Sequence, residues 1–333
     1  MKLEIDEIKK LINQQNFPLD VTRGKMGISL CLYLLGRKLN NKVYESYAFD
    51  ILRDVLSNTQ DIASIDIEQG LAGIGIILNY LATEDYIEGD INYMLLDADN
   101  LILKNLNPKN ETDFQIDGLI DMLYYIAIRL GNKSIKKDYR YLFQESAIGL
   151  INKLSDRINA DFFEESIPYS IRNQLANLLY LLSLFYKLEF YNSRLNKIMY
   201  EISYRLFSFL PILNSNKLLL IAAMSSVKKY CNVQNWQKHI DLLKKEFDVD
   251  ALIYQEVRAK NISISNGLSG LLLALSLSKE EFSTEEYGRI KYKLLEQFNI
   301  EDLKKNILSL KANNMSLFYG ELGALTIYNM SEI

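Results

Sequence analysis

The stretch Gly70-Leu71-Ala72-Gly73-Ile74-Gly75 places glycines among apolar residues and begins a longer apolar run. The same pattern of glycine followed by apolar residues recurs along the chain with a period of about 50 residues. A fixed period of this length is typical of one supersecondary unit that is repeated. The other copies are Gly24-Lys25-Met26-Gly27-Ile28, Asp117-Gly118-Leu119-Ile120, Asn266-Gly267-Leu268-Ser269-Gly270 and Tyr319-Gly320-Glu321-Leu322-Gly323.

Two kinds of helical segment alternate along the repeat. Residues 69–82 are apolar on nearly every side of a helix, which indicates burial, whereas residues 43–57 have one apolar stripe and one charged face. We therefore expect an all-α fold, an α/α toroid of about seven inner and about seven outer helices, formed by a single domain over residues 1–333. The other inner helices are expected at 25–39, 117–130, 170–186, 216–230, 266–278 and 319–330, and the other outer helices at 3–15, 91–105, 136–155, 192–209, 236–247 and 284–297.

The composition excludes several classes of protein. Apolar residues make up 49% of the chain, which is enough for a sizeable core, and only 4 residues are proline. The 38 Lys and Arg residues nearly balance the 42 Asp and Glu residues, so no nucleic-acid partner is expected. No apolar run has the length of a membrane span, and the first residues do not resemble a signal peptide. With 2 cysteines, which cannot form a disulfide framework, we expect a cytoplasmic protein.

The glycines at the expected inner-helix starts need an explanation, because glycine inside a helix costs about 1 kcal/mol relative to alanine. Close packing against a neighbouring backbone is one explanation. The other is a central cup lined by helix N-termini, where free N–H groups and a partial positive field could serve a ligand. The sequence leaves both open.

These motifs resemble those of the lanthionine synthetase C-like proteins, the cyclase family of lanthipeptide biosynthesis. Gly24-Lys25-Met26-Gly27-Ile28 is similar to the first repeat of that family, and residues 70–75 are similar to its second. Residues 266–270 are similar to its sixth repeat, and residues 320–323 are similar to its seventh. The resemblance covers the whole chain. It implies an enzyme that adds a peptide cysteine to a dehydrated residue, with a zinc ion held by two Cys and one His that lowers the thiol pKa.

The positions that match the family's zinc ligands hold other residues here. Its sixth-repeat Cys-His-Gly falls on Ser265-Asn266-Gly267, and its fifth-repeat Cys falls on Ser215. Its fourth-repeat catalytic His falls on Asn173, and the Asp that precedes its third-repeat glycine is nearest to Asp113. Because Ser and Asn are weak zinc ligands, we expect no metal and no other cofactor.

Other polar residues near the helix starts are further candidates. Asp117 and Asp121 share a helix face, as paired carboxylates of a sugar-processing toroid would, although first-turn Asp also serves as a helix cap. Glu321 interrupts a small, apolar motif, and Arg172 would give the cup an anion- or peptide-binding character. The residues expected to line the cup are Asp113, Asp117, Arg172, Asn173, Ser215, Ser265, Asn266 and Glu321.

The sequence thus favours a divergent, zinc-free relative of the cyclases that binds a peptide substrate, a leader peptide or a modifying enzyme. Two alternatives remain. One is an active cyclase in which Ser, Asn or a partner's residues replace the ligands, and the other is a carbohydrate-processing toroid that uses Asp117 or Asp121 with Glu321.

Overall fold

The computed structural model describes residues 5–106, 114–257, 261–309 and 312–332. Helices form the regular secondary structure of this described part, and no strand occurs in it. None of the described helices is long and apolar enough to cross a membrane. The chain divides into two compact units: the first comprises Met1–Phe114, Ile128–Ser146 and Asn299–Ile333, and the second comprises Gln115–Ala127 and Ala147–Phe298.

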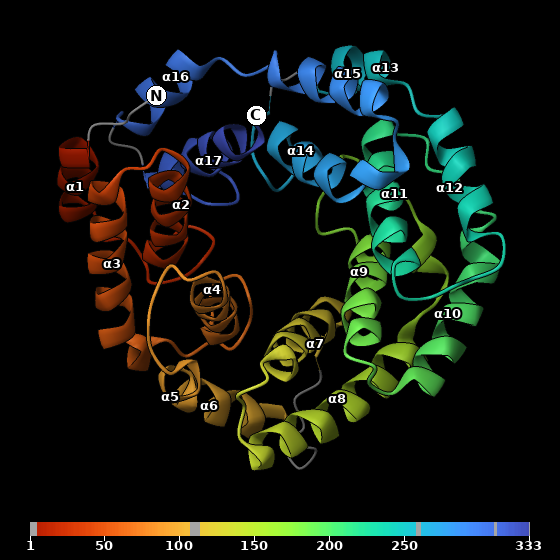
Figure 1. Ribbon diagram of the computed structural model, residues 1–333, viewed down its shortest axis with the longest axis horizontal. Helices are drawn as coiled ribbons and strands as arrows, with labels where there is room; N and C mark the ends of the chain where they lie inside the picture. Colours follow the sequence, from red (N-terminus) through yellow and green to blue (C-terminus); the bar gives the residue numbers. More distant parts are fainter. Residues whose placement is uncertain (1–4, 107–113, 258–260, 310–311, 333) are drawn as a thin grey trace. The chain divides into compact units, whose positions relative to one another are not determined.

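The first unit is built from an inner row of helices and an outer layer (Figure 1). In the inner row, α2 (Lys25–Lys38) contacts both α4 (Leu71–Thr83) and α17 (Glu321–Ser331), so the beginning and the end of the chain pack together. In the outer layer, α3 (Lys42–Ser57) packs against α2, and α16 (Ile300–Ile307) packs against α17. Both α5 (Ile91–Met94) and α6 (Leu96–Leu106) pack against α4. The helix α1 (Ile5–Gln14) precedes these elements in the chain.

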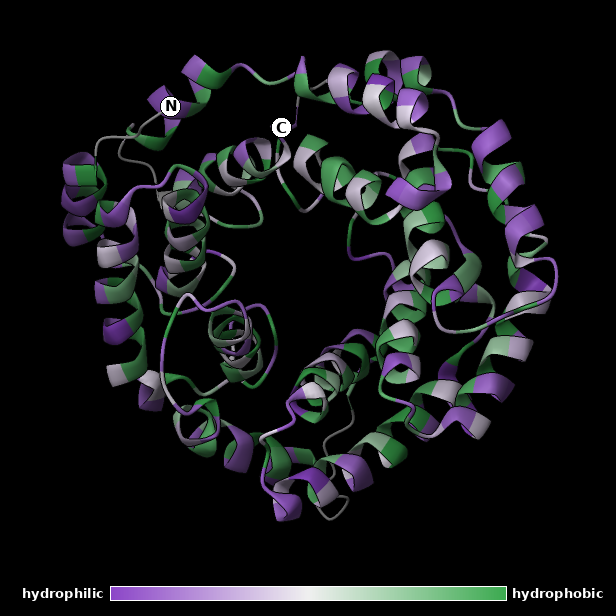
Figure 2. Cartoon of the chain, viewed as in Figure 1, coloured by the Kyte–Doolittle hydropathy of each residue, from purple (hydrophilic) through white to green (hydrophobic). Residues whose placement is uncertain are grey.

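The second unit has the same two-layer construction. Its central helix, α11 (Asn214–Lys228), contacts α9 (Gln174–Lys187) and α14 (Leu268–Leu277), and every residue of α11 from Asn214 to Val227 is buried. Figure 2 shows hydrophilic residues of the outer helix α12 on the side away from α11. The outer layer consists of α10 (Asn192–Leu206) against α9, α12 (Trp236–Lys245) against α11, and α15 (Thr284–Leu295) against α14.

Two longer helices, α7 (Ile116–Gly131) and α8 (Lys137–Arg157), contribute residues to both units. Within the first unit, the end of α7 is tied to α6 by a buried ion pair in which Arg129 Nε and Nη2 donate to the Asp99 carboxylate at 3.0 and 2.7 Å. The short helical turns are η1 (Thr59–Asp61), η2 (Ala160–Phe163), α13 (Val249–Ala251), η3 (Leu252–Glu256), η4 (Lys279–Glu281) and η5 (Ala312–Met315).

The predicted alternation of buried and amphipathic helices is confirmed within each unit. Each predicted inner range contains one helix, although α9 begins only at Gln174 and its predicted first residues form a loop. The outer segment predicted at 91–105 is divided at Leu95 into α5 and α6. The helix α16 was not predicted, because its eight residues follow closely on the longer α15.

Close packing explains the paired glycines of the repeat. Gly24, Gly70, Gly267 and Gly320 precede α2, α4, α14 and α17, and a Cβ atom at any of them would overlap a carbonyl oxygen of the preceding loop. A Cβ atom at Gly27, Gly73, Gly270 or Gly323 would overlap the carbonyl oxygens of Val21, Ile67, Ile264 or Leu317, respectively. The first glycine of each pair has a negative φ, so space rather than a left-handed backbone requires glycine.

The loops before these helices share a turn that the glycine pattern alone did not reveal. An Asp or Ser stands four residues before the first glycine, and its side chain accepts a hydrogen bond from the backbone N–H three residues later, as in Asp66 to Gln69 at 2.6 Å. In the first unit, Thr22 links three such loops: its backbone N–H donates to the Glu68 carbonyl at 3.2 Å, and its carbonyl accepts from Leu317 N–H at 3.1 Å. The equivalent pairs are Asp20 with Arg23, Ser263 with Asn266, and Ser316 with Tyr319.

Candidate functional site

The loop of residues 166–173, which precedes α9 and is called the α9 loop below, gathers several of the predicted site residues in the second unit. Arg172 Nη2 donates to both carboxylate oxygens of Asp121 at 3.1 and 3.2 Å. The backbone N–H of Ile171 donates to the carbonyl of Ser265 at 2.8 Å. Asn173 caps α9, and its Oδ1 atom accepts from Ala176 N–H at 3.0 Å. The α9 loop therefore lies against both α7 and the loop before α14.

The two aspartates of α7 have different surroundings. Asp121 is 7% exposed and paired with Arg172, whereas Asp117 is exposed and accepts a hydrogen bond from Gln174 Nε2 at 3.1 Å. One turn further on, burial and the neighbouring Tyr180 hold the pKa of Tyr124 well above its ordinary value. The Tyr124 hydroxyl donates to the Asn177 carbonyl at 3.1 Å. These groups form a polar junction between α7 and α9.

Ser215, the residue that matches the fifth-repeat zinc ligand, is held by a carboxylate from a different part of the second unit. Its hydroxyl and its backbone N–H donate to Glu256 Oε2 at 2.7 and 2.9 Å. The other oxygen, Glu256 Oε1, accepts from the backbone N–H and the side-chain amide of Asn214 at 2.7 and 3.0 Å. Both oxygens of Glu256 are therefore engaged at the start of α11.

A second carboxylate, Glu165, secures the residues just before Ser215. Its two oxygens accept from the backbone N–H groups of Ile212 at 2.8 Å and Leu213 at 2.7 Å, and Oε1 also accepts from Asn216 Nδ2 at 3.0 Å. Two anions at one helix N-terminus satisfy its free N–H groups and complement the helix dipole. Asn216 Nδ2 also donates to the Ser166 carbonyl at 2.9 Å, which joins this helix start to the α9 loop.

The sixth-repeat position lies in the loop before α14. Asn266 is exposed, and its Oδ1 atom accepts from Asn261 Nδ2 at 2.7 Å and from Ser263 Oγ at 2.9 Å. Ser265 is half-buried, and its carbonyl is the one bound by the α9 loop. These contacts shape the loop, and the Asn266 side chain stays at the surface.

Two predicted site residues do not belong to this group. Glu321 lies in the first unit, in the first turn of α17, where its Oε1 atom accepts from Asn306 Nδ2 at 3.4 Å. Asp113 lies outside the described residues. The structure thus brings together Asp117, Arg172, Asn173 and Ser265 around the α9 loop, with Ser215 joined to that loop through its neighbour Asn216.

The residues at the matched ligand positions do not fit a zinc ion. Zinc sites use thiolate, imidazole or carboxylate donors, whereas the Ser215 hydroxyl is neutral and already donates to Glu256. Within the described residues, no group of three His, Cys, Asp or Glu side chains is arranged to hold a metal ion. His239 lies on α12, 5% exposed, with its ring 5.7 Å from that of Phe207, and burial lowers its pKa. Burial raises the pKa of Cys31 to about 12.

Sequence reasoning did not single out Glu256 or Glu165 as a residue of the site. Glu256 lies about 40 residues beyond Ser215 in the chain, in the π-helical turn η3, and no local motif marks it. Only the fold brings the two residues together, so the sequence carried no usable signal for this contact.

Comparison with solved structures reveals a likeness to nisin cyclase. Nisin cyclase matches with a TM-score of 0.63 and 17% sequence identity over 98% of this chain and 93% of that chain. No protein-family model matches the sequence, and no curated protein matches it either. At this identity the likeness shows the fold alone. The chain has the lanthionine synthetase C-like fold, and the predicted all-α fold of the α/α toroid class is confirmed.

Proposed function

We propose that this chain, which shares its fold with nisin cyclase, is a zinc-free component of a peptide-modification system. In this proposal it acts in the cytoplasm and binds a peptide or a partner modifying enzyme, without closing thioether rings through a zinc-bound thiolate. The observation that carries the proposal is the contact between Ser215 and Glu256 at 2.7 Å. It supports a structural role for the position at which the family resemblance implies a zinc ligand.

The chemistry of these donors supports the absence of a zinc cyclase step. A zinc ligand must offer a lone pair without a competing proton, and cysteine does so as a thiolate. At the start of α11, the Ser215 proton and three N–H groups point to Glu256, whose oxygens are fully used by them. Asn173 uses its side-chain oxygen to cap α9, so it has no group that could replace a catalytic imidazole.

The α9 loop has features that suit a peptide. Arg172 is 33% exposed in its side chain although it pairs with Asp121, and Asn266 is exposed in the adjoining loop. Amide and guanidinium groups can hydrogen-bond the backbone of an extended peptide, and the exposed carboxylate of Asp117 can pair with a basic side chain. In the proposal, the face formed by Asp117, Arg172 and Asn266 is the peptide-binding surface.

Metal analysis and a cyclisation assay test the catalytic half of the proposal. Purified protein should contain well under one equivalent of zinc, and it should not accelerate ring closure in a dehydrated peptide that contains cysteine. Ser265→Cys with Asn266→His should bind zinc weakly, because two ligands leave the tetrahedron incomplete. Adding Ser215→Cys should increase affinity, and more so with Glu256→Gln, because a nearby carboxylate disfavours a thiolate. Stoichiometric zinc or ring closure by the unmodified protein would refute this half.

A binding experiment tests the other half. The probe is a labelled precursor peptide encoded beside the gene for this protein, and the readout is fluorescence anisotropy. Asn266→Trp should weaken binding, because it places a bulky side chain on the proposed surface. Asn192→Trp, at an exposed position of α10 in the same unit, is the matched control and should bind as the unmodified protein does. Equal binding by both variants would argue against this surface.

A further inference from the structure

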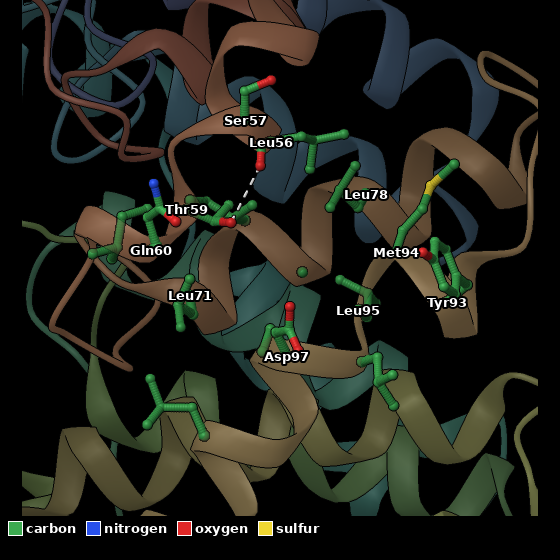
Figure 3. A pocket seen from close by; sticks show the side chains of 16 residues that line it. Leu56, Ser57, Thr59, Gln60, Leu71, Leu78, Tyr93, Met94, Leu95 and Asp97 are labelled. Carbon is green, nitrogen blue, oxygen red and sulfur yellow. Dashed lines mark hydrogen bonds between the residues drawn. The ribbon is translucent and has the colours of Figure 1, made fainter.

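The first unit contains a large cavity with a partly apolar lining, whereas the site described above belongs to the second unit. Its volume is about 710 Å³, and it lies between α3, η1, α4 and the α5–α6 segment. Figure 3 shows apolar side chains from these elements around the open space. The apolar lining includes Leu56, Leu71, Ile74, Leu78, Leu95 and Leu101.

The break in the outer layer accounts for the cavity. The outer segment that covers α4 is divided at Leu95, and α5 is a single turn of four residues. Ile74 and Leu78 of α4, which are 2% and 1% exposed, form the floor of the cavity. A second cavity of about 380 Å³ shares Leu56, Ser57 and Met94 with the first. The two neighbouring cavities form one groove, called the α3–α6 groove below.

The charges along the α3–α6 groove are mainly negative. Asp97, an exposed residue in the first turn of α6, lines the larger cavity, and Figure 3 shows its side chain among the lining leucines. The exposed Glu88 lines the smaller cavity. Among the described residues that line the two cavities, Arg53 is the one basic residue, and it pairs with Asp50 at 3.2 Å. Within the described part of the chain, no cation that lines the groove is therefore paired with Asp97 or Glu88.

Exposed aromatic side chains complete the groove. Tyr93 is 79% exposed and lines the larger cavity, and Phe49 is 52% exposed and lines the smaller one. Aromatic faces attract Lys and Arg side chains, and apolar walls attract the aliphatic residues of the same segment. The combination of an apolar floor, an acidic edge and aromatic rings complements an amphipathic segment with basic residues.

We propose that the α3–α6 groove is a second peptide-binding site, which takes the apolar side chains of a cationic amphipathic peptide while Asp97 and Glu88 pair with its basic residues. The proposal deepens the proposed function and rests on it, because it names the charge class of the bound peptide. The α3–α6 groove belongs to the first unit, whereas the α9-loop surface belongs to the second.

Fluorescence anisotropy with the full-length protein tests this site. The probe is a short labelled peptide of leucine and lysine whose leucines form one helix face, and a leucine–glutamate peptide of the same pattern is the second probe. Asp97→Lys should weaken binding of the lysine probe at least about tenfold, because it reverses the charge at the groove. Ala98→Trp should weaken it similarly, because Ala98 lines the larger cavity and tryptophan would fill it. Asp138→Lys is the matched control, since Asp138 is also exposed in the first turn of a helix of the first unit.

The outcomes separate this proposal from the proposed function. The groove proposal would be overturned if all variants bound the lysine probe with equal affinity. It would also be overturned if the unmodified protein bound the glutamate probe as tightly as the lysine probe. The groove proposal would also be overturned if Asn266→Trp lost binding of the lysine probe while Asp97→Lys and Ala98→Trp bound it normally. That result would leave the proposed α9-loop surface standing. Weaker binding in the two groove variants, with normal thermal unfolding and an unchanged Asp138→Lys control, is the expected result.

Discussion

At the residue scale, the start of α11 shows how a ligand position can become a structural one. Glu256, in the turn η3, and Glu165, in a loop, are distant in sequence. Together they accept hydrogen bonds from the backbone N–H groups of Ile212, Leu213, Asn214 and Ser215. Negative charge at a helix N-terminus is favourable because of the helix dipole. We infer that these carboxylates stabilise the second unit.

Replacing Glu256 with glutamine should therefore destabilise the protein. The amide group of glutamine would face hydrogen-bond donors at one of the two acceptor positions, and the negative charge would be lost. The expected decrease in the free energy of unfolding is about 1.5–3 kcal/mol, the range for hydrogen bonds to charged groups. Urea denaturation measures it, with Glu201→Gln on the exposed side of α10 as the control. A decrease no larger than in the control would show that the carboxylate contributes nothing.

His239 gives the second residue-scale prediction, a dependence of stability on pH. Burial lowers its pKa in the folded protein, and this effect exceeds the opposing hydrogen bond to the Phe209 backbone. The unfolded chain therefore binds a proton more readily than the folded chain, so stability is lost as the pH falls from the ordinary histidine range through the lowered value. As the pH is lowered, the melting temperature of His239→Gln should fall less steeply than that of the unmodified protein. Parallel curves between neutral and mildly acidic pH would contradict this.

At the element scale, most of the helices were predictable because burial leaves a periodic record in the sequence. The apolar run after Gly70 and the stripe of residues 43–57 each predicted a helix within a few residues of its observed bounds. The failures also have physical causes. Leu95 is fully compatible with a helix, so the break between α5 and α6 leaves no Gly or Pro as a signal. The stripe Ile300, Leu303 and Ile307 of α16 is present in the sequence but short.

The glycine pairs provide the element-scale prediction. Gly73 lies in α4 where a Cβ atom would overlap the Ile67 carbonyl oxygen, whereas a Cβ atom at Gly149 of α8 would have no neighbour within 4 Å. Gly73→Ala should lower the free energy of unfolding by about 1–3 kcal/mol, as overpacking does. Gly149→Ala should raise it by about 0.5–1 kcal/mol, because alanine favours the helix. Urea denaturation of both variants tests this, and stabilisation by Gly73→Ala would refute the packing explanation.

At the scale of the whole molecule, the candidate site was less predictable than the fold. The repeat placed Asn173, Ser215 and Ser265 near helix starts, which is where they lie. The sequence could not show that the Ser265 carbonyl binds Ile171 or that Arg172 pairs with Asp121, because these contacts join residues about 50 or more positions apart. Helix starts follow from local sequence, whereas partners between repeats depend on how the helices pack.

The first unit yields the last prediction, because both ends of the chain contribute to it. Ser316 Oγ and Leu317 N–H donate to the Thr22 carbonyl at 2.6 and 3.1 Å, and α17 packs against α2. Removal of residues 299–333 would expose the face of α2 that α17 covers. Each buried aliphatic side chain lost in this way, such as Leu322 and Leu325, contributes about 1.5–3 kcal/mol, and the net stability of a domain is only about 5–15 kcal/mol.

The shortened chain 1–298 should therefore lose more helix by circular dichroism than α16 and α17 themselves supply. Residues of the first unit should become sensitive to limited proteolysis, because their remaining helices lack a complete core. Adding the separate peptide 299–333 should restore part of the lost signal, which distinguishes a missing packing partner from general misfolding. The opposite result would be a shortened chain that melts at the same temperature as the full protein and loses only the helix that α16 and α17 supply. That result would show that α17 is dispensable to the first unit.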